Sequence, residues 1–218
     1  SQALQSWYVM RLLGHRRGGF FVDVGAYNGV DLSNTLDLEL YHGWDGICVD
    51  AGLRHVWSLS HRRCRAARAL VGNGSFEVFD SRASVGLDRW SGIVSAGSPS
   101  GGWPRPQHLG DLMRMPTAPL AAILRGLGAP RDIDYLSVDL EGAETAAFHG
   151  FPFHEYRVKV ITVERPAPEL RALLESNGFR FVRWVGEGLD VLFAHESLPG
   201  LDDLAPRWWN GCGKFCDN

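Results

Sequence analysis

The chain has 218 residues, of which 45% are hydrophobic and 22% charged, so it can bury a core without metal or disulfide staples. Its formal net charge of -3 excludes a general attraction to nucleic acid or to anionic membranes. No apolar run approaches the roughly 18 residues of a membrane-spanning helix. We therefore expect one soluble domain over residues 1–218, without membrane contact.

Apolar runs and helical patterns alternate along the chain from residue 20 onward. Strands are predicted, in chain order, at residues 20–24, 46–50, 68–71, 76–79, 133–138 and 158–163. Helices are predicted between or after them, at residues 31–41, 53–63, 119–127 and 168–177, and Gly178 is expected to cap the last one. This alternation favours an α/β fold with a mostly parallel sheet and helices on both faces.

The regular pattern breaks down between about Ser81 and Gln107, a segment rich in Gly, Ser and Pro. A loop of this length inside a compact domain is either functional or disordered. Two interpretations stay open: a lid over a ligand, with Trp90 and Trp103 as aromatic contacts, and a flexible insertion.

A hairpin is predicted near the C-terminus. Residues 179–185 and 189–195 both look like strands, and Gly186-Glu-Gly188 between them is too short for a crossover. The sheet is therefore expected to include one antiparallel strand, unlike an all-parallel dinucleotide-binding sheet. We place the core at about residues 20–195 and a tail at residues 196–218. Two interpretations are open for Trp208 and Trp209, stacking on a sugar and packing of the tail onto the domain, and packing is favoured.

Two further patterns are given simple interpretations. The cluster Arg62, Arg63, Arg65 and Arg68 is expected to be the solvated face of a helix. The eight histidines show no metal-ligand spacing, so each is expected to be structural or exposed.

Among the four cysteines, only Cys212 and Cys216 are close in sequence, and zinc would need more ligands than these two. A disulfide between them would indicate a secretory compartment. Because the sequence starts at Ser1, an upstream segment could have been removed. The compartment stays open between the cytoplasm, which is the default, and the secretory pathway or Golgi lumen.

The first motif with chemical content is Asp23-Val-Gly-Ala-Tyr-Asn-Gly29, which follows one strand, with Asp50 at the end of the next. Gly25 allows a sharp turn and a close approach of the backbone to a ligand. An acidic residue in the place of Asp50 accepts the hydroxyls of a ribose. The turn has only Gly25 and Gly29, which suits a pyrophosphate poorly and disfavours a nicotinamide oxidoreductase. A nucleoside without phosphate fits better, and S-adenosylmethionine is the commonest, with Asp23 near its ammonium group.

The second motif is the run from Ile133 to Glu144, which places Asp139 and Glu141 at the carboxyl end of a central strand. Glu164 ends the next strand and is expected to flank the same pocket, because ligands bind at this edge of open α/β sheets. Like charges so close together raise one another's pKa, and a cation, a metal or hydroxyl donors would relieve that cost. Glu144 is expected to cap or decorate a helix.

Several segments together resemble the FkbM family of methyltransferases, over about residues 20–193: Phe21-Val-Asp-Val-Gly-Ala-Tyr-Asn-Gly29, Ser33-Asn-Thr35, Gly43-Trp-Asp-Gly-Ile47, Asp134-Tyr-Leu-Ser-Val-Asp-Leu-Glu-Gly-Ala-Glu144 and Lys159-Val-Ile-Thr-Val-Glu164. The resemblance implies a Rossmann-like class I methyltransferase sheet and S-adenosylmethionine as methyl donor. The implied reaction is methylation of a hydroxyl on a sugar, a glycan or a small natural product.

The resemblance also implies roles for individual residues. Cofactor contacts are expected from Asp23, Gly25, Ala26, Tyr27, Gly29, Asn34, Asp50, Ala51 and Asp139. Catalytic roles near the substrate are expected for Asp139, Glu141 and Glu164. The chain departs from the family pattern at Asp50-Ala-Gly, where many relatives have Glu and Pro, and at Arg165-Pro166, where close relatives often have His and Asn.

The expected mechanism has two versions. Either Asp139 or Glu141 acts as the general base for the hydroxyl, or Asp139 and Glu164 bind Mg²⁺ or another divalent cation that acidifies it. Two other functions stay open: a non-catalytic interaction protein of the same family and an RNA methyltransferase. The second is disfavoured because the chain has a net negative charge and no evident basic groove for RNA. Substrate identity, metal use and oligomeric state are not predicted.

Overall fold

The computed structural model describes residues 4–81, 91–94 and 112–201 of the chain. Trp90, Trp103, Trp208, Trp209 and the pair Cys212 and Cys216 lie outside these residues, so the predictions made for them stay predictions. Within the described residues, no helix is both long and apolar enough to cross a membrane.

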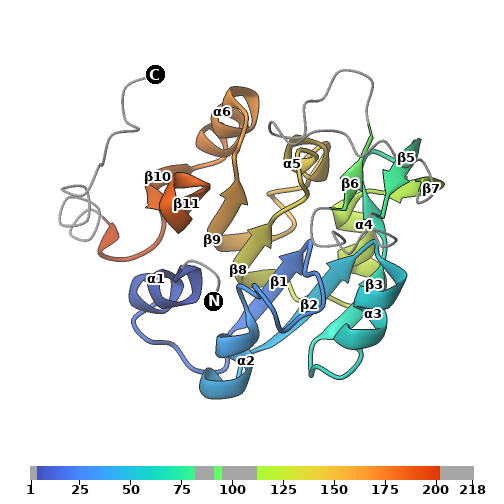
Figure 1. Ribbon diagram of the computed structural model, residues 1–218. Coiled ribbons are helices and arrows are strands. Elements are labelled where there is room, and N and C mark those ends of the chain that lie inside the picture. The colour runs from blue at the N-terminus through green and yellow to red at the C-terminus, as the bar shows by residue number, and fades with distance from the viewer. Residues whose placement is uncertain (1–3, 82–90, 95–111, 202–218) are drawn as a thin grey trace.

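A seven-stranded sheet forms the centre of the molecule, in the order β10-β11-β9-β8-β1-β2-β3 (Figure 1). Its strands are β1 (Phe20–Val24), β2 (Asp45–Asp50), β3 (Arg65–Arg68), β8 (Asp132–Val138), β9 (Arg157–Glu164), β10 (Phe179–Val185) and β11 (Asp190–His195). Neighbouring strands from β9 to β3 are parallel, and β11 runs antiparallel to both β9 and β10. The predicted hairpin and the predicted antiparallel strand are confirmed, and the fold is the Rossmann-like sheet of methyltransferases.

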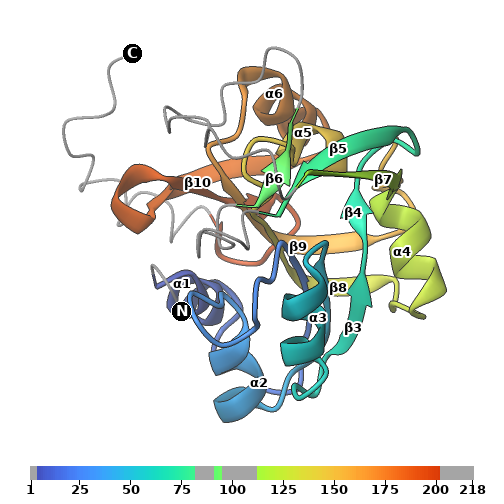
Figure 2. The same ribbon diagram turned by 45° about the vertical axis from the view of Figure 1, so that its right-hand side comes forward.

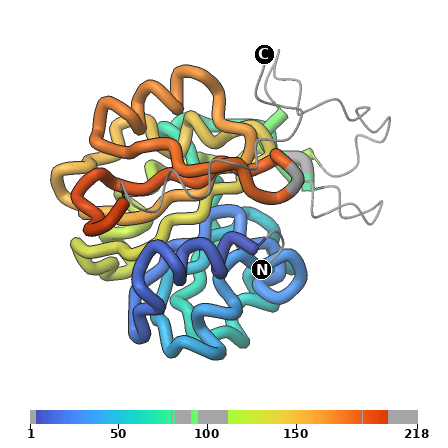
Figure 3. Tube along the Cα trace, turned by 90° about the vertical axis from the view of Figure 1, so that its left-hand side faces the viewer, coloured from blue at the N-terminus to red at the C-terminus, as the bar shows by residue number. Residues whose placement is uncertain are grey.

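Three helices cover each face of this sheet, because its strands are apolar on both sides. On β1, Phe21 packs with α1 (Gln5–Leu12), α2 (Leu36–His42) and α3 (Leu53–Leu59), whereas Val22 and Val24 pack with α4 (Leu120–Gly126), α5 (Glu144–Ala147) and α6 (Pro168–Ser176). Figure 3 shows α1 and α2 in blue below the red hairpin and α6 in orange above it. Successive side chains of a strand point to opposite faces of the sheet, so alternate residues pack into two separate hydrophobic layers.

A second, four-stranded sheet was not predicted. Its order is β4-β7-β5-β6, and its strands are β4 (Leu70–Val71), β5 (Phe76–Asp80), β6 (Gly92–Ile93) and β7 (Leu112–Ala118). Figure 2 shows it beside the ends of the main sheet. The prediction that residues 76–79 continue the parallel sheet was wrong, because β5 pairs antiparallel with β6 and β7. β6 also gives regular structure to part of the segment expected to be irregular.

Helix α2 begins at Leu36, five residues later than predicted. The backbone of Leu32 has a φ of 59°, which no α-helix accommodates, and the hydroxyl of Ser33 accepts hydrogen bonds from the N–H groups of Thr35 and Leu36. A side chain that satisfies the free N–H groups in this way starts a helix rather than continues one.

The interpretation of the arginine cluster as a solvated helix face was wrong. Arg65 and Arg68 lie on β3, and the Arg62 side chain is only 4% exposed. Arg62 forms an ion pair with the equally buried Glu39, at 3.2 Å. Burial of a guanidinium requires such a partner, and this one lies more than twenty residues away along the chain.

A disulfide joins Cys48 on β2 to Cys64, just before β3, with their Cα atoms 6.0 Å apart. Both cysteines are buried. Their separation of 16 residues gives no local signal in the sequence, and this pairing was not predicted.

Candidate active site

A cavity of about 240 Å³ opens where β1, β2, β8 and β9 end. Its walls come from four segments: the turn after β1, the end of β2 with the start of α3, the loops after β8 and β9, and part of the second sheet. The residues that line it include Asp23, Gly25, Ala26, Tyr27, Asn34, Asp50, Ala51, His55, Leu70, Phe79, Ser91, Ile93, Asp139, Glu141, Glu164 and Arg165. The carboxyl ends of parallel strands are the usual ligand site of such sheets. All predicted site residues except Gly29 line this cavity.

The turn after β1 is held tightly against its neighbours. The N–H groups of Gly25 and Ala26 donate to the carbonyl oxygen of Val49, at 2.9 and 3.1 Å. Gly25 has a φ of 82°, and a Cβ there would lie 1.7 Å from the carbonyl oxygen of Asp139. Any side chain at this position would therefore force β1 and β8 apart. Glycine is required here because the turn packs closely against the protein's own backbone at Asp139.

Gly29 supports the turn from behind. It has a φ of 76°, and a Cβ there would lie 2.5 Å from the Leu59 side chain and 2.8 Å from that of Arg62. Arg62 donates to the Gly29 carbonyl at 3.0 Å. Gly29 thus allows the turn to pack on α3 and on the buried arginine.

One end of the cavity carries Asp23 and Asn34. The Thr35 hydroxyl donates to the Asp23 carboxylate at 2.6 Å. Burial raises the pKa of Asp23, while that hydrogen bond and the charge of Arg62 oppose the shift. The amide nitrogen of Asn34 donates to Ser137, but its oxygen is buried without a hydrogen-bond partner among the described residues. A buried acceptor left unpaired is costly, so a donor from a ligand would be favoured there.

Asp50 is held in place from three sides. Its carboxylate accepts the N–H of Tyr27 at 2.9 Å and the N–H of Gly52 at 2.7 Å. His55 Nδ1 lies 2.7 Å from the same carboxylate, and the ring of His55 packs edge-on against that of Tyr27. These contacts fix the position of the carboxylate at the cavity wall. His55 had been expected to be structural or exposed; it is buried and belongs to the site.

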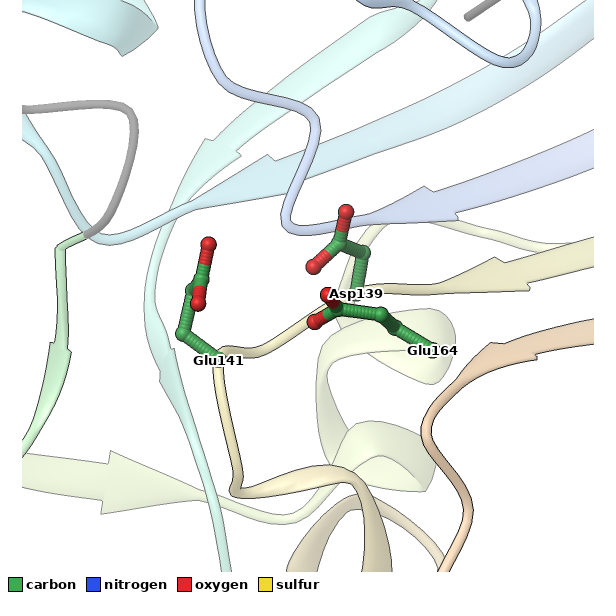
Figure 4. A group of neighbouring side chains, drawn as sticks. All are labelled: Asp139, Glu141 and Glu164. Carbon is green, nitrogen blue, oxygen red and sulfur yellow. The ribbon is translucent and has the colours of Figure 1, made fainter. Parts of the chain in front are cut away.

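The cavity wall also holds three carboxylates, Asp139, Glu141 and Glu164, which we call the acidic trio. Each offers an oxygen within 4.8 Å of the other two. Figure 4 shows Asp139 and Glu164 turned toward one another from neighbouring strands, with Glu141 facing them from the loop after β8. Burial first, and then the charges of Glu164 and Glu141, raise the pKa of Asp139 well above its usual value. The trio therefore has a high affinity for a proton or a cation.

Two other charged residues flank the trio. Arg165 lines the cavity and forms an ion pair with Glu164 at 3.1 Å. Asp190 pairs with Glu164 across the β9–β11 ladder, and its carboxylate accepts a hydrogen bond from Gln5 of α1. Burial and the nearby charge of Glu164 raise the pKa of Asp190 to about 6. No sequence motif marked Asp190, because only the hairpin brings it next to Glu164.

The prediction for Glu144 is confirmed. It is the first residue of α5, and its carboxylate accepts the N–H groups of Leu140 and Gly142, both at 3.0 Å. Glu144 therefore fixes the loop that carries Glu141, and it does not belong to the trio.

Backbone strain is concentrated around the cavity. Six described residues other than glycine have a positive φ, and four of them line it: Tyr27, Leu32, Glu141 and Arg165, with φ between 38° and 59°. Such conformations cost roughly 1 to 3 kcal/mol each and persist where the surrounding structure imposes them. Their clustering marks the cavity as the functional part of the molecule.

Comparison with known proteins agrees with this placement. The family model described as the methyltransferase FkbM domain matches residues 23–181. The match begins at Asp23 and ends within β10, so it includes the turn after β1, Asp50 and the whole acidic trio. No curated protein sequence matches the chain.

Proposed function

The chain belongs to the FkbM family of methyltransferases, and we propose that it uses S-adenosylmethionine to methylate a hydroxyl group of a sugar, a glycan or a small natural product. The observation that carries the proposal is one cavity lined by Asp23, Asn34 and Asp50 and also by the acidic trio.

The residues of the cavity suit an adenosyl cofactor. The unpaired oxygen of Asn34 and the carboxylate of Asp23 would accept hydrogen bonds from its ammonium group. Asp50 would hold the ribose, and the apolar side chains of Leu70 and Phe79 would cover the base. The Asp23 carboxylate, beside the turn after β1, would repel a pyrophosphate, which supports the choice of a cofactor without one.

The acidic trio would handle the proton of the acceptor hydroxyl. When bound, S-adenosylmethionine would supply a methyl group, carried on a positively charged sulfur, for in-line transfer to the acceptor oxygen. Asp139 would accept the hydroxyl proton, because its raised pKa makes it a stronger base than an ordinary carboxylate once it is ionised. The cavity would contribute by holding the two reactants in line, an effect worth on the order of 7 to 11 kcal/mol in favourable cases.

A divalent cation is the second version of this mechanism. Oxygen ligands from carboxylates are those that Mg²⁺ prefers, and the trio offers three within 4.8 Å. Asp139 and Glu164 would hold the cation, which would acidify the hydroxyl. Loss of activity in a chelator and recovery with magnesium would select this version; activity that is indifferent to the chelator would select the general base.

Binding of S-adenosylhomocysteine tests the cofactor site. We expect Asp50→Ala to weaken binding by about 2 to 4 kcal/mol, or roughly 30-fold to several hundred-fold, because charge-assisted hydrogen bonds are lost. Isothermal calorimetry measures the change. The matched control is Asp45→Ala, at the other end of β2, whose side chain is 74% exposed. Equal affinities of the two variants would contradict the assignment of Asp50.

A further inference from the structure

The Cys48–Cys64 disulfide encloses the part of the chain that forms the nucleoside end of the cavity. We call residues 48–64 the nucleoside arm. It contains the end of β2, α3 and the turn before β3, and four of its residues line the cavity: Val49, Asp50, Ala51 and His55. The disulfide therefore closes a covalent loop that contains Asp50, the residue proposed to bind the ribose.

Helix α3 contributes few buried side chains to the nucleoside arm. Helix α3 has seven residues and no side-chain cap, and only His55 and Leu59 of the helix are buried. Leu53 and Trp57, on the same helix, are 67% and 73% exposed. So short a helix is marginal without tertiary support. The disulfide thus adds a covalent constraint to the hydrogen bonds that hold Asp50 and His55.

The disulfide is also linked to the other side of the cavity. The N–H of Cys64 donates to Glu39, whose carboxylate also accepts the guanidinium of Arg62. Arg62 in turn donates to the carbonyl of Gly29 and to the hydroxyl of Thr35. Thr35 donates to Asp23, so hydrogen bonds run without a break from the cystine to the proposed ammonium site.

We propose that the Cys48–Cys64 disulfide forms during folding and is required for tight binding of the adenosyl cofactor. This inference rests on the proposed function. Without the cross-link, the nucleoside arm samples more conformations, and binding must order it again at the expense of affinity. A preorganised arm binds the cofactor without that cost.

Formation of the disulfide is an oxidation with a defined partner class. The two thiols lose two protons and two electrons, and a disulfide of a protein oxidase or of a small thiol takes them up and becomes two thiols. Both sulfurs are buried in the folded chain, so the exchange takes place before the nucleoside arm closes. Such oxidation is typical of secretory or other oxidising compartments.

Calorimetry with S-adenosylhomocysteine on oxidised and reduced protein tests the inference. The protein to use is Cys212→Ser/Cys216→Ser, which leaves Cys48 and Cys64 as the only cysteines. One sample is kept oxidised and one is refolded in reductant, and alkylation in denaturant counts their free thiols as zero and two. We expect the reduced sample to bind about tenfold more weakly or worse, and reoxidation to restore affinity.

Hydrogen exchange locates the effect. In the reduced sample, amides of the nucleoside arm should exchange faster, while those of β8 and β9 should not change. Equal affinity of both samples would overturn the inference and leave the proposed function intact. Failure of the oxidised sample to bind would instead overturn the proposed function.

If the reduced chain does not fold, the variant Cys48→Val/Cys64→Ala replaces it. A folded variant that binds as tightly as the oxidised protein would overturn the inference, and a folded variant with weaker binding would support it. Global unfolding of this variant as well would contradict a role confined to the nucleoside arm.

Discussion

The two ends of the cavity use carboxylates in opposite ways. At the nucleoside end, Asp50 is surrounded by donors: two backbone N–H groups and the ring of His55. At the other end, Asp139 faces two further carboxylates, and its pKa is raised. One carboxylate is held at a fixed position by hydrogen-bond donors, and the other lies among like charges that raise its pKa. The proposed roles in binding and in proton transfer follow from this difference in environment rather than from residue type.

The largest expected effect comes from removing the base. We expect Asp139→Asn to lower kcat by about 10²- to 10⁴-fold, the range typical of general acid–base catalysis, and to leave the affinity for S-adenosylhomocysteine within a few-fold. Steady-state kinetics and calorimetry on the same preparation provide both values. If the variant keeps its kcat but loses its affinity for S-adenosylhomocysteine, Asp139 is a cofactor-binding residue and not the base.

Asp190 should make the folded protein less stable as the pH rises. Its folded pKa of about 6 lies above the unfolded value near 3.9, so the folded state binds more protons between these values. The free energy of unfolding should therefore fall from about pH 4 to pH 6, by up to roughly 3 kcal/mol from this group. We expect Asp190→Asn to remove that part of the slope and to stabilise the protein at pH 7, as urea titrations at several pH values would reveal. Parallel curves for the two proteins would argue against a raised pKa.

His55 should matter through Asp50. We expect His55→Ala to weaken binding of S-adenosylhomocysteine about tenfold, because one hydrogen bond to a charged carboxylate is lost and Asp50 gains freedom. The control is His61→Ala, an exposed histidine just after α3. Should both variants bind like the unaltered protein, Asp50 is held by its backbone donors alone.

The smallest expected effect is a shift of the pH profile. If Asp139 is the base, activity should fall with decreasing pH as its carboxylate becomes protonated, and its raised pKa places this loss at a higher pH than for an ordinary aspartate. Glu141→Gln removes one of the charges that raise this pKa. We expect the acidic limb of kcat/KM to move to lower pH, by about one unit or less. A limb that stays in place would mean that Glu141 does not act on the titrating group.

The main sheet and most of the site could be predicted from the sequence, because both depend on local patterns. The turn at Gly25, the position of Asp50 and the strand ends that carry Asp139 and Glu164 are each visible within one motif. The hairpin, too, is encoded by a short loop between two strand patterns. Parallel strands then bring the motif ends together without further information.

Other features could not be predicted from the sequence, mainly because they depend on contacts between distant segments. The second sheet joins β5 to β7 across a long stretch, the Arg62–Glu39 pair forms between the turn after α3 and helix α2, and Cys48 meets Cys64 only because β2 and β3 are neighbours. The role of His55 follows from the direction in which α3 leaves Asp50. The contacts between distant segments have no local signal, and the His55 contact, although local, depends on how α3 is oriented, so only the folded chain reveals them.

A crystal structure of the protein with S-adenosylhomocysteine tests the central claim most directly. The account predicts the ribose hydroxyls at hydrogen-bond distance from Asp50, the ammonium group beside Asn34 and Asp23, and the sulfur on the side of the acidic trio. A ligand bound elsewhere, or a cavity that stays closed to it at saturating concentration, would contradict the account.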